Sequence, residues 1–411
     1  MNIALFSEVS AAHVIGGAER VLRQQAVGLK ARGHHVEVTS RARQGERQDQ
    51  VVIDGILERR YHVRRTNELS FVSSTMKQTI MAFERAQRRA AIDVGIVYQS
   101  LAGLGPLLKR SGAMTNWLYM CLSLAHEEFM TRTLPGTSGE ARLRWTVNAY
   151  ARRWIERLVM RRCRSVVVLS DFMRQRVINV HGISNDKIHV IPGAVDQKRF
   201  HPARARHEVR RVLGLPEKRI VLFTVRNLVP RMGLENLIQA IADLERSGHE
   251  RPLVLVGGEG PLQVKLERLI HRHRLGNDVK LLGFVREDQL PLYYQSADLV
   301  VMPTLQLEGF GLVTVEAMAC GTPVLATPVA ALPEVVNRID PLLVAEGADA
   351  ASLAAAIAKI IGRFRADPEE ARRLSRRSRQ LVETVYNWDR HCVDLEGLIQ
   401  DVAAIRARKA A

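Results

Sequence analysis

The sequence predicts an α/β protein with two successive, doubly wound, Rossmann-like domains, each built around a parallel β-sheet. The chain has 411 residues, of which 46% are apolar, and this is ample for two hydrophobic cores. Short apolar runs alternate with amphipathic, helix-like runs, an order typical of parallel strands joined by crossover helices. We expect the first domain to cover residues 1–203 and the second to cover residues 204–384.

The first half opens with a clear strand–loop–helix–strand unit. Asn2–Phe6 is a short apolar strand, a loop with Gly16 and Gly17 follows, and residues 18–31 carry apolar side chains at nearly helical spacing before Gly33. Further strands of this half are predicted at 36–39, 94–98, 115–119, 165–169 and 188–191.

The second half repeats this alternation after a polar segment at 199–216. Its strands are predicted at 220–224, 253–256, 279–282, 299–302, 323–326 and 342–344. Helices are predicted between them at 233–246, 262–274, 289–296 and 312–319. From Asp367 onward the chain is charged and helical in pattern.

Composition excludes several classes of protein. No run approaches the roughly 18 apolar residues of a membrane span, and the N-terminus MNIALFSEVS lacks the basic start and cleavage site of a signal peptide. The cysteines are scattered singly, which argues against a structural zinc site and for a reducing, cytoplasmic setting. They are Cys121, Cys163, Cys320 and Cys392.

The chain is strongly basic, with a net charge of +17. Its arginines concentrate in the first half, at Arg59–Arg65, Arg85–Arg89 and Arg142–Arg164. Nucleic acid, an anionic membrane surface and phosphorylated substrates are all candidate partners for such charge. The alternative is that these arginines are merely the solvated faces of helices.

The segment at residues 308–328, EGFGLVTVEAMACGTPVLATP, carries the most information about function. Glu316 lies inside a helix that begins near Gly311, whereas Glu308 lies in the loop before it. Both carboxylates can therefore face one ligand at the N-terminus of that helix. Free backbone N–H groups and the positive end of the helix dipole suit a phosphate there. Two acids beside a phosphate site suggest a nucleotide-sugar.

Two other loops in this half follow predicted strands. Arg226 and Arg231 come directly after the strand at 220–224, where two guanidinium groups can converge on a diphosphate. Gly257 and Gly258 open a turn after the next strand and allow close backbone approach to a ligand. Neither loop matches a dinucleotide fingerprint or a P-loop.

Together these motifs resemble glycosyltransferase family 4, the retaining enzymes of the GT-B fold also called glycosyl transferases group 1. The resemblance extends over nearly the whole chain. It rests on Gly16–Arg20, on VVVLSDFMRQRV at 166–177, on IHVIPGAVDQKRFHP at 188–202, on Arg226 and Arg231, on Gly257–Pro261, and on Glu308 with Glu316 as the E-x(7)-E signature.

The resemblance implies two domains that face each other across a cleft, with a C-terminal helix at 385–411 crossing back to the first domain. The donor would be a UDP- or GDP-linked sugar held mostly by the second domain. Glu308 would contact the sugar hydroxyls and Glu316 the ribose, while Arg226 and Arg231 would offset the charge of the leaving diphosphate. The implied donor-binding set is Gly16, Gly17, Arg226, Arg231, Gly257, Gly258, Glu308, Gly309, Phe310, Gly311, Leu312 and Glu316.

The resemblance also implies chemistry without a metal or other cofactor, and the chain has no Asp-x-Asp motif. The leaving phosphate oxygen would accept the acceptor's proton, so that no side-chain base is needed. Many members carry a histidine two residues after a tyrosine in the first domain. Here Cys121 stands at that place after Tyr119, and His126 is the nearest histidine. His126 either acts near the sugar or lies on a helix surface facing solvent.

Two further departures lie in the second domain. Arg231 stands where members usually have lysine, which replaces a point charge by a planar fork. Val225 stands where glycine commonly precedes the first arginine.

The basic segment at 140–164 interleaves eight arginines with aromatic and aliphatic residues. A helix of this composition can lie on an anionic membrane. We expect instead that its stripe of large apolar residues packs into the core, and that only its charge gives a weak membrane contact. The stripe consists of Trp145, Tyr150, Trp154, Leu158 and Val159.

The resemblance, together with the basic first half, therefore implies a retaining hexosyltransferase for cell-surface or exported polysaccharide, acting on a saccharide or lipid-linked acceptor, with no nucleic-acid partner expected. Two alternatives stay open. One is a sugar epimerase or an inverting transferase of the same fold. The other is a non-catalytic protein that binds nucleotide-sugar or, through its arginines, nucleic acid.

Overall fold

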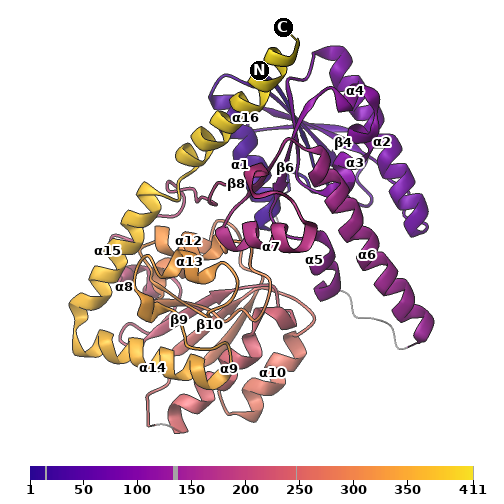
Figure 1. Ribbon diagram of the computed structural model, residues 1–411. Coiled ribbons are helices and arrows are strands. Elements are labelled where there is room, and N and C mark those ends of the chain that lie inside the picture. Colours follow the sequence, from indigo (N-terminus) through magenta and orange to yellow (C-terminus); the bar gives the residue numbers. More distant parts are fainter. Residues whose placement is uncertain (14–15, 133–137, 247, 411) are drawn as a thin grey trace. The chain divides into compact units, whose positions relative to one another are not determined.

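The computed structural model describes residues 1–13, 16–132, 138–246 and 248–410 (Figure 1). The chain forms two compact units. Unit 1 comprises residues 1–192 and 388–411, and unit 2 comprises residues 193–387. The division lies before the expected boundary at 203, and the C-terminal helix belongs to unit 1.

Unit 1 is built on an eight-stranded sheet of order β3-β4-β2-β1-β5-β6-β7-β8. All neighbouring strands are parallel except β3 and β4. The strands are β1 (Asn2–Phe6), β2 (His35–Arg41), β3 (Gln50–Ile53), β4 (Ile56–Tyr61), β5 (Val94–Val97), β6 (Asn116–Cys121), β7 (Ser165–Val168) and β8 (Ile188–Val190).

Helices cover both faces of this sheet. They are α1 (Gly17–Ala31), α2 (Glu68–Arg89), α3 (Ser100–Leu108), α4 (Arg110–Ala113), α5 (Ala125–Arg132), α6 (Gly139–Arg162), α7 (Asp171–His181) and α16 (Trp388–Ala410), with a 3₁₀ turn η1 (Asn185–Lys187). Helices α2, α3 and α6 contribute to one core, in which the rings of Phe6, Phe83 and Trp117 pack with centroids 5.6–6.3 Å apart. Helices α1 and α16 contact each other away from that core (Figure 1).

Unit 2 has a five-stranded parallel sheet of order β11-β10-β9-β12-β13. Its strands are β9 (Val221–Val225), β10 (Leu253–Gly257), β11 (Val279–Gly283), β12 (Leu299–Met302) and β13 (Val324–Ala326). Its helices are α8 (Arg206–Val212), α9 (Leu234–Arg246), α10 (Gln263–Arg272), α11 (Leu290–Ser296), α12 (Leu312–Ala319), α13 (Leu332–Val336), α14 (Ala350–Ala366) and α15 (Pro368–Thr384), with 3₁₀ turns η2 (Pro230–Met232) and η3 (Pro341–Leu343).

One predicted strand is wrong. Residues 342–344 fall mostly in the 3₁₀ turn η3, and only Val344 forms an isolated bridge, with Ala326. The carboxylate of Asp340 accepts a hydrogen bond from the backbone N–H of Leu342 at 2.9 Å, which favours a turn over an extended strand.

The expected packing of the stripe on α6 is also wrong in part. Val159 is buried, but Tyr150 and Trp154 are 65% and 63% exposed. The buried face of α6 is formed by Ala149, Glu156, Val159 and Met160 instead. Helical spacing alone cannot tell which of two apolar faces finds a partner.

Among the described residues, no helix combines the length and the apolar composition that a membrane-spanning segment needs.

Candidate functional site

Three loops of unit 2 leave the sheet at the carboxyl ends of neighbouring strands. The loop at 226–233 follows β9, the turn at 257–260 follows β10, and the loop at 303–311 follows β12. Strand β9 lies between β10 and β12, so the chain order reverses beside it. In open α/β sheets, ligands bind at the carboxyl edge where the strand order reverses. The topology thus brings the predicted arginines, glycines and carboxylates of unit 2 to one edge.

Arg226 is buried at this edge, with a side chain only 5% exposed. Its Nη2 donates hydrogen bonds to Oγ1 of Thr304 and to Oε2 of Glu308. Its Nε is buried without a hydrogen-bond partner. A buried, charged guanidinium with an unused N–H donor can bind an anionic group through that donor.

Arg231 lies within the short turn η2 and contacts the same loop. Its Nη1 donates to the carbonyl oxygen of Leu307 at 2.8 Å, and its own carbonyl accepts from the N–H of Leu305 at 2.8 Å. Both predicted arginines are therefore bonded to the segment that carries Glu308. Leu307 itself has a φ of 54°, which is unusual for a residue with a side chain.

The glycine turn after β10 passes very close to the backbone of Arg226. The N–H of Arg226 donates to the carbonyl of Gly257 at 2.9 Å. Gly258 has a φ of 123°, and a Cβ on it would lie 2.0 Å from the carbonyl oxygen of Arg226. Only glycine fits at this position, so the turn fixes the course of the backbone on which Arg226 stands.

The loop at 303–311 ends at Gly311, which is the N-cap of α12 with a φ of 85°. The backbone N–H groups of the first turn of a helix lack the usual partners within the helix. In α12, the N–H of Thr314 donates to the carbonyl of the cap residue Gly311 at 2.8 Å. Just before it, Phe310 is buried against Tyr386, with ring centroids 5.5 Å apart, and against Gly193. Phe310 therefore anchors the loop that presents Gly309 and Gly311.

Glu316 lies on the buried side of α12 and is 2% exposed. Its Oε2 accepts a hydrogen bond of 2.9 Å from the hydroxyl of Tyr294 on α11. Tyr294 is fully buried, and its ring packs on Phe200 and Phe223. Neither Tyr294 nor Thr304 was among the predicted site residues. Each lies outside the recognisable motifs and reaches the site only through tertiary structure.

Unit 2 thus gathers most of the predicted donor-binding residues. Two guanidinium groups, the N-terminus of α12 and two carboxylates lie in or beside three adjacent loops. The cationic groups suit a diphosphate, and carboxylates suit sugar hydroxyls. Val225 is the last residue of β9 and Leu312 the first of α12.

The remaining predicted residues belong to unit 1. Gly16 is the N-cap of α1 and Gly17 its first residue, and the N–H of Gly16 donates to the carboxylate of Glu19 at 3.1 Å. Cys121 ends β6 within the hydrophobic core, where burial raises the pKa of its thiol well above the usual value. A buried thiol of this kind is inert.

His126 is 7% exposed, which excludes the expected alternative of a histidine facing solvent. Its ring meets that of His181 edge to face, with centroids 5.8 Å apart, and its Nδ1 lies 3.9 Å from Oε2 of Glu156. The same carboxylate accepts hydrogen bonds from Tyr119 Oη at 3.0 Å, from His181 Nε2 at 3.1 Å and from the N–H of Ala125. Burial acts to raise the pKa of Glu156, but the neighbouring histidines and the N–H of Ala125 outweigh it and lower the pKa.

His126, Glu156 and His181 are the group of described residues spaced closely enough to hold a metal, with ligand atoms within 4.8 Å of one another. If His181 donates its Nε2–H to Glu156, its buried Nδ1 is only an unpaired acceptor. If Nε2 instead bound a metal, Nδ1 would carry the proton as a buried N–H without a hydrogen-bond partner. A buried donor without a partner costs more free energy than a buried acceptor without one. The geometry therefore supports a hydrogen-bonded cluster that ties α5, α6 and α7 together.

Comparison with family models matches both halves of the chain. Residues 16–194 match the glycosyl transferase 4-like domain, and residues 205–381 match the glycosyl transferases group 1. A GDP-mannose-dependent α-(1-6)-phosphatidylinositol monomannoside mannosyltransferase of Mycolicibacterium smegmatis is 30% identical over 295 residues, covering 70% of this chain and 70% of the relative. The Mycobacterium tuberculosis H37Rv protein of the same name is 31% identical over 248 residues, or 59% of this chain. The match spans 63% of the M. tuberculosis protein's length.

Solved structures match almost the entire chain. Sucrose-phosphate synthase from Thermosynechococcus elongatus has a TM-score of 0.79 at 24% identity and covers 98% of this chain and 99% of its own. Anabaena HepE, solved in complex with UDP, has a TM-score of 0.72 at 20% identity, with coverage of 98% and 100%. At these identities the likeness establishes the fold.

Proposed function

Since the chain belongs to the group 1 glycosyl transferases of family 4 and has their GT-B fold, we propose that it transfers a hexose from a UDP- or GDP-linked sugar with retention of anomeric configuration. The acceptor in this proposal is a saccharide or a lipid-linked saccharide used for cell-surface or exported polysaccharide. The reaction needs no metal and takes place at the inner face of the cytoplasmic membrane. The lipid acceptor in the name of the mycobacterial relatives supports this setting.

One observation carries the proposal. Arg226 and Arg231 both donate hydrogen bonds to the segment 304–308, which carries Glu308 and leads into the N-terminus of α12. Positive groups and the carboxylate that we propose to bind the sugar are thereby held together on one loop system. Such preorganised groups stabilise charge that develops on a leaving diphosphate.

The proposed reaction proceeds on one face of the sugar. The acceptor oxygen forms a bond to the anomeric carbon as the bond from that carbon to the β-phosphate oxygen breaks. The proton of the acceptor hydroxyl passes to the departing phosphate oxygen, and the nucleoside diphosphate leaves. Arg226, Arg231 and the N–H groups at Phe310 and Gly311 would stabilise the departing diphosphate, while Glu308 would hold the sugar and Glu316 the ribose. His126 is a further candidate for contact with the sugar.

Ligand binding to the folded chain provides the first test. We expect either UDP or GDP, with its sugar conjugate, to raise the melting temperature in the presence of EDTA, because a ligand that binds only the folded state stabilises it. Arg226→Ala and Glu316→Ala should lose this shift. Arg286→Ala removes an exposed arginine paired with Asp288 in the same unit and should keep it. A chain that binds neither nucleotide contradicts the donor assignment.

Product analysis distinguishes the reactions that share this site. With UDP-glucose or GDP-mannose and a lipid or oligosaccharide acceptor, the new glycosidic bond should have the anomeric configuration of the donor by NMR. Arg226→Ala should lower kcat/KM by about 100-fold or more, as the loss of one charge-stabilising group does in other enzymes. Inversion, turnover of the sugar without an acceptor, or nucleotide binding with normal turnover in both variants would each contradict the proposal.

A further inference from the structure

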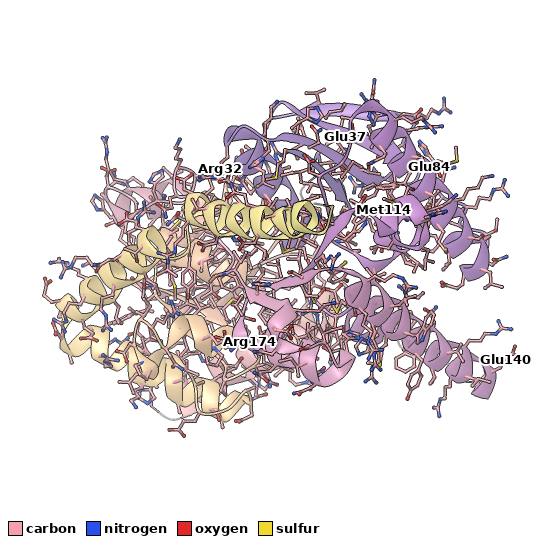
Figure 2. All side chains as sticks on the ribbon, turned by 45° about the horizontal axis from the view of Figure 1, so that its top comes forward. Arg32, Glu37, Glu84, Met114, Glu140 and Arg174 are labelled. Carbon is pink, nitrogen blue, oxygen red and sulfur yellow. The ribbon has the colours of Figure 1, made fainter. Side chains whose placement is uncertain are left out.

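Helix α6 carries four large apolar side chains on its solvent side. Leu143, Val147, Tyr150 and Trp154 are 64%, 58%, 65% and 63% exposed. A single exposed apolar residue is ordinary on any protein surface, but a contiguous apolar patch marks a contact surface. Figure 2 shows Glu140 near the N-terminal end of this helix.

The four residues form one stripe along the helix. Their spacing of 4, 3 and 4 positions keeps them within about 60° of one another around the axis. Over 11 residues the stripe is about 16 Å long. The buried residues Ala149, Glu156, Val159 and Met160 lie on the opposite side. Helix α6 is thus apolar on two opposite faces, and only one of them finds a partner among the described residues.

Arginines flank this exposed stripe on both sides. Arg142, Arg161 and Arg162 are exposed. Arg153 is exposed as well, and its Nη2 donates to the carbonyl oxygen of Val180 at 2.8 Å. Arg144 is 79% exposed and pairs with Glu140 across one turn of the helix. The other acidic residue of α6, Glu156, is buried on the opposite face. The face that carries the stripe is therefore strongly positive around an apolar centre.

We propose that this face of α6 docks onto an anionic lipid surface, with the apolar stripe entering the interfacial layer and the flanking arginines contacting lipid phosphates. Trp and Tyr combine an apolar ring with a polar group, which suits the boundary between headgroups and acyl chains. Basic side chains beside a helix add attraction to anionic lipids. This inference deepens the membrane location given in the proposed function and does not depend on the chemistry of the transfer.

Charge favours a lipid surface over a second copy of the chain. A symmetric dimer through this stripe would bring one arginine-rich helix against another, and like charges repel across such an interface. A bilayer of anionic lipids supplies the opposite charge and an apolar layer together.

Vesicle flotation with the full-length protein tests the inference. At low salt, wild type should float with phosphatidylglycerol vesicles, float weakly with phosphatidylcholine vesicles, and be released as salt rises. The double variant Tyr150→Glu/Trp154→Glu should have a partition coefficient into vesicles that is lower by about tenfold or more, because neither position then carries an apolar ring into the interfacial layer. Phe284→Glu changes a residue of unit 2 that is also 64% exposed, and it should bind vesicles as wild type does.

A second measurement guards against misfolding of the double variant. Wild-type fluorescence minus that of Trp154→Phe isolates the emission of Trp154, which should shift to the blue and be quenched by brominated phosphatidylglycerol. An absence of flotation, or unquenched Trp154, would overturn the inference. So would a dimer in sedimentation velocity that Trp154→Glu dissociates, together with no vesicle binding. None of these results depends on donor or acceptor, so they test the membrane location separately from the transfer chemistry.

Discussion

Tyr294 donates its hydroxyl to Oε2 of Glu316 at 2.9 Å, and both side chains are buried. The backbone carbonyl of Tyr294 also accepts a hydrogen bond of 2.7 Å from Oγ1 of Thr322, just beyond the end of α12. Tyr294 therefore ties α11 to Glu316 on α12 and to the turn just beyond the C-terminal end of that helix. We expect Tyr294 to act as a positioning residue for Glu316, because its hydroxyl restricts the rotamers of the side chain that we propose to hold the ribose.

Tyr294→Phe should weaken donor binding without abolishing transfer. Removing one buried hydrogen bond costs about 1 kcal/mol, so we expect the donor KM to rise about five- to tenfold with kcat nearly unchanged. Steady-state kinetics with the donor identified by thermal shift checks this. Tyr293→Phe is the matched control, because the neighbouring ring stacks on Phe223. Equal donor KM values in the two variants would contradict the positioning role.

Gly258→Ala should disrupt the site through the backbone. The new Cβ would lie 2.0 Å from the carbonyl oxygen of Arg226 at a φ of 123°, so the two loops must separate. We expect a loss of about 2 kcal/mol or more in the free energy of unfolding and a loss of donor binding. Gly276→Ala is the control in the same unit, since a Cβ there meets nothing within 4 Å. Urea unfolding and donor-induced thermal shifts measure both effects.

The alternation of strands and helices was readable because each apolar run in a parallel sheet is short and bounded by turns. Predicted β1, β11 and β12 agree closely with the structure, and α12 agrees residue for residue. The hairpin of β3 and β4 was missed although Asp54-Gly55 signals it. Their φ values of 49° and 74° are typical of the tight turn that joins two antiparallel strands.

The sequence located the loops that we propose to bind the donor, but not the residues that contact Arg226 and Glu316 there. Arg226, Arg231 and Glu308 follow strands that the apolar pattern reveals, so their shared edge was predictable. Thr304 and Tyr294 bear no local signal. The contact of Thr304 with Arg226 depends on how the loop after β12 packs on the loop after β9, and the contact of Tyr294 with Glu316 depends on the packing of α11 on α12. For α6, the sequence showed an apolar stripe but could not show that a second apolar face, with Ala149 and Met160, would be the buried one.

The buried pair of Arg226 and Glu308 should show strong coupling in a double-mutant cycle. Their side chains are 5% and 16% exposed, so removing one partner leaves a poorly solvated charge. We expect each single alanine variant to lose about 3 kcal/mol of stability, and the double variant to lose clearly less than the sum. The exposed pair Arg286–Asp288 should show a coupling of about 1 kcal/mol or less. Similar coupling energies for both pairs, from urea unfolding, would contradict this reading.

The free energy of unfolding should fall as the pH drops below about 6.5, because His391 is buried as a neutral ring. Its Nδ1 donates to the carbonyl of Pro192 at 2.7 Å, and its Nε2 lies 2.8 Å from Nε2 of Gln25, whose carbonyl oxygen accepts from Tyr98. That arrangement requires a neutral ring that accepts at Nε2. Burial lowers the pKa of His391 below the ordinary 6.5. Between the two pKa values, His391 is protonated in the unfolded chain but not in the folded chain. The stability present above pH 6.5 is therefore lost as the pH falls toward the pKa of the folded state.

Urea midpoints measured between pH 8 and pH 5 separate His391 from acidic groups. The lowered pKa of Glu156 acts only below its ordinary 4.5, outside this window. His391→Asn cannot titrate and should flatten the decline between about pH 6.5 and 5. His271→Asn, which replaces an exposed histidine of unit 2, should keep the wild-type profile. A wild-type midpoint that stays constant down to pH 5, or an unchanged slope in His391→Asn, would show that the buried ring is not the titrating group.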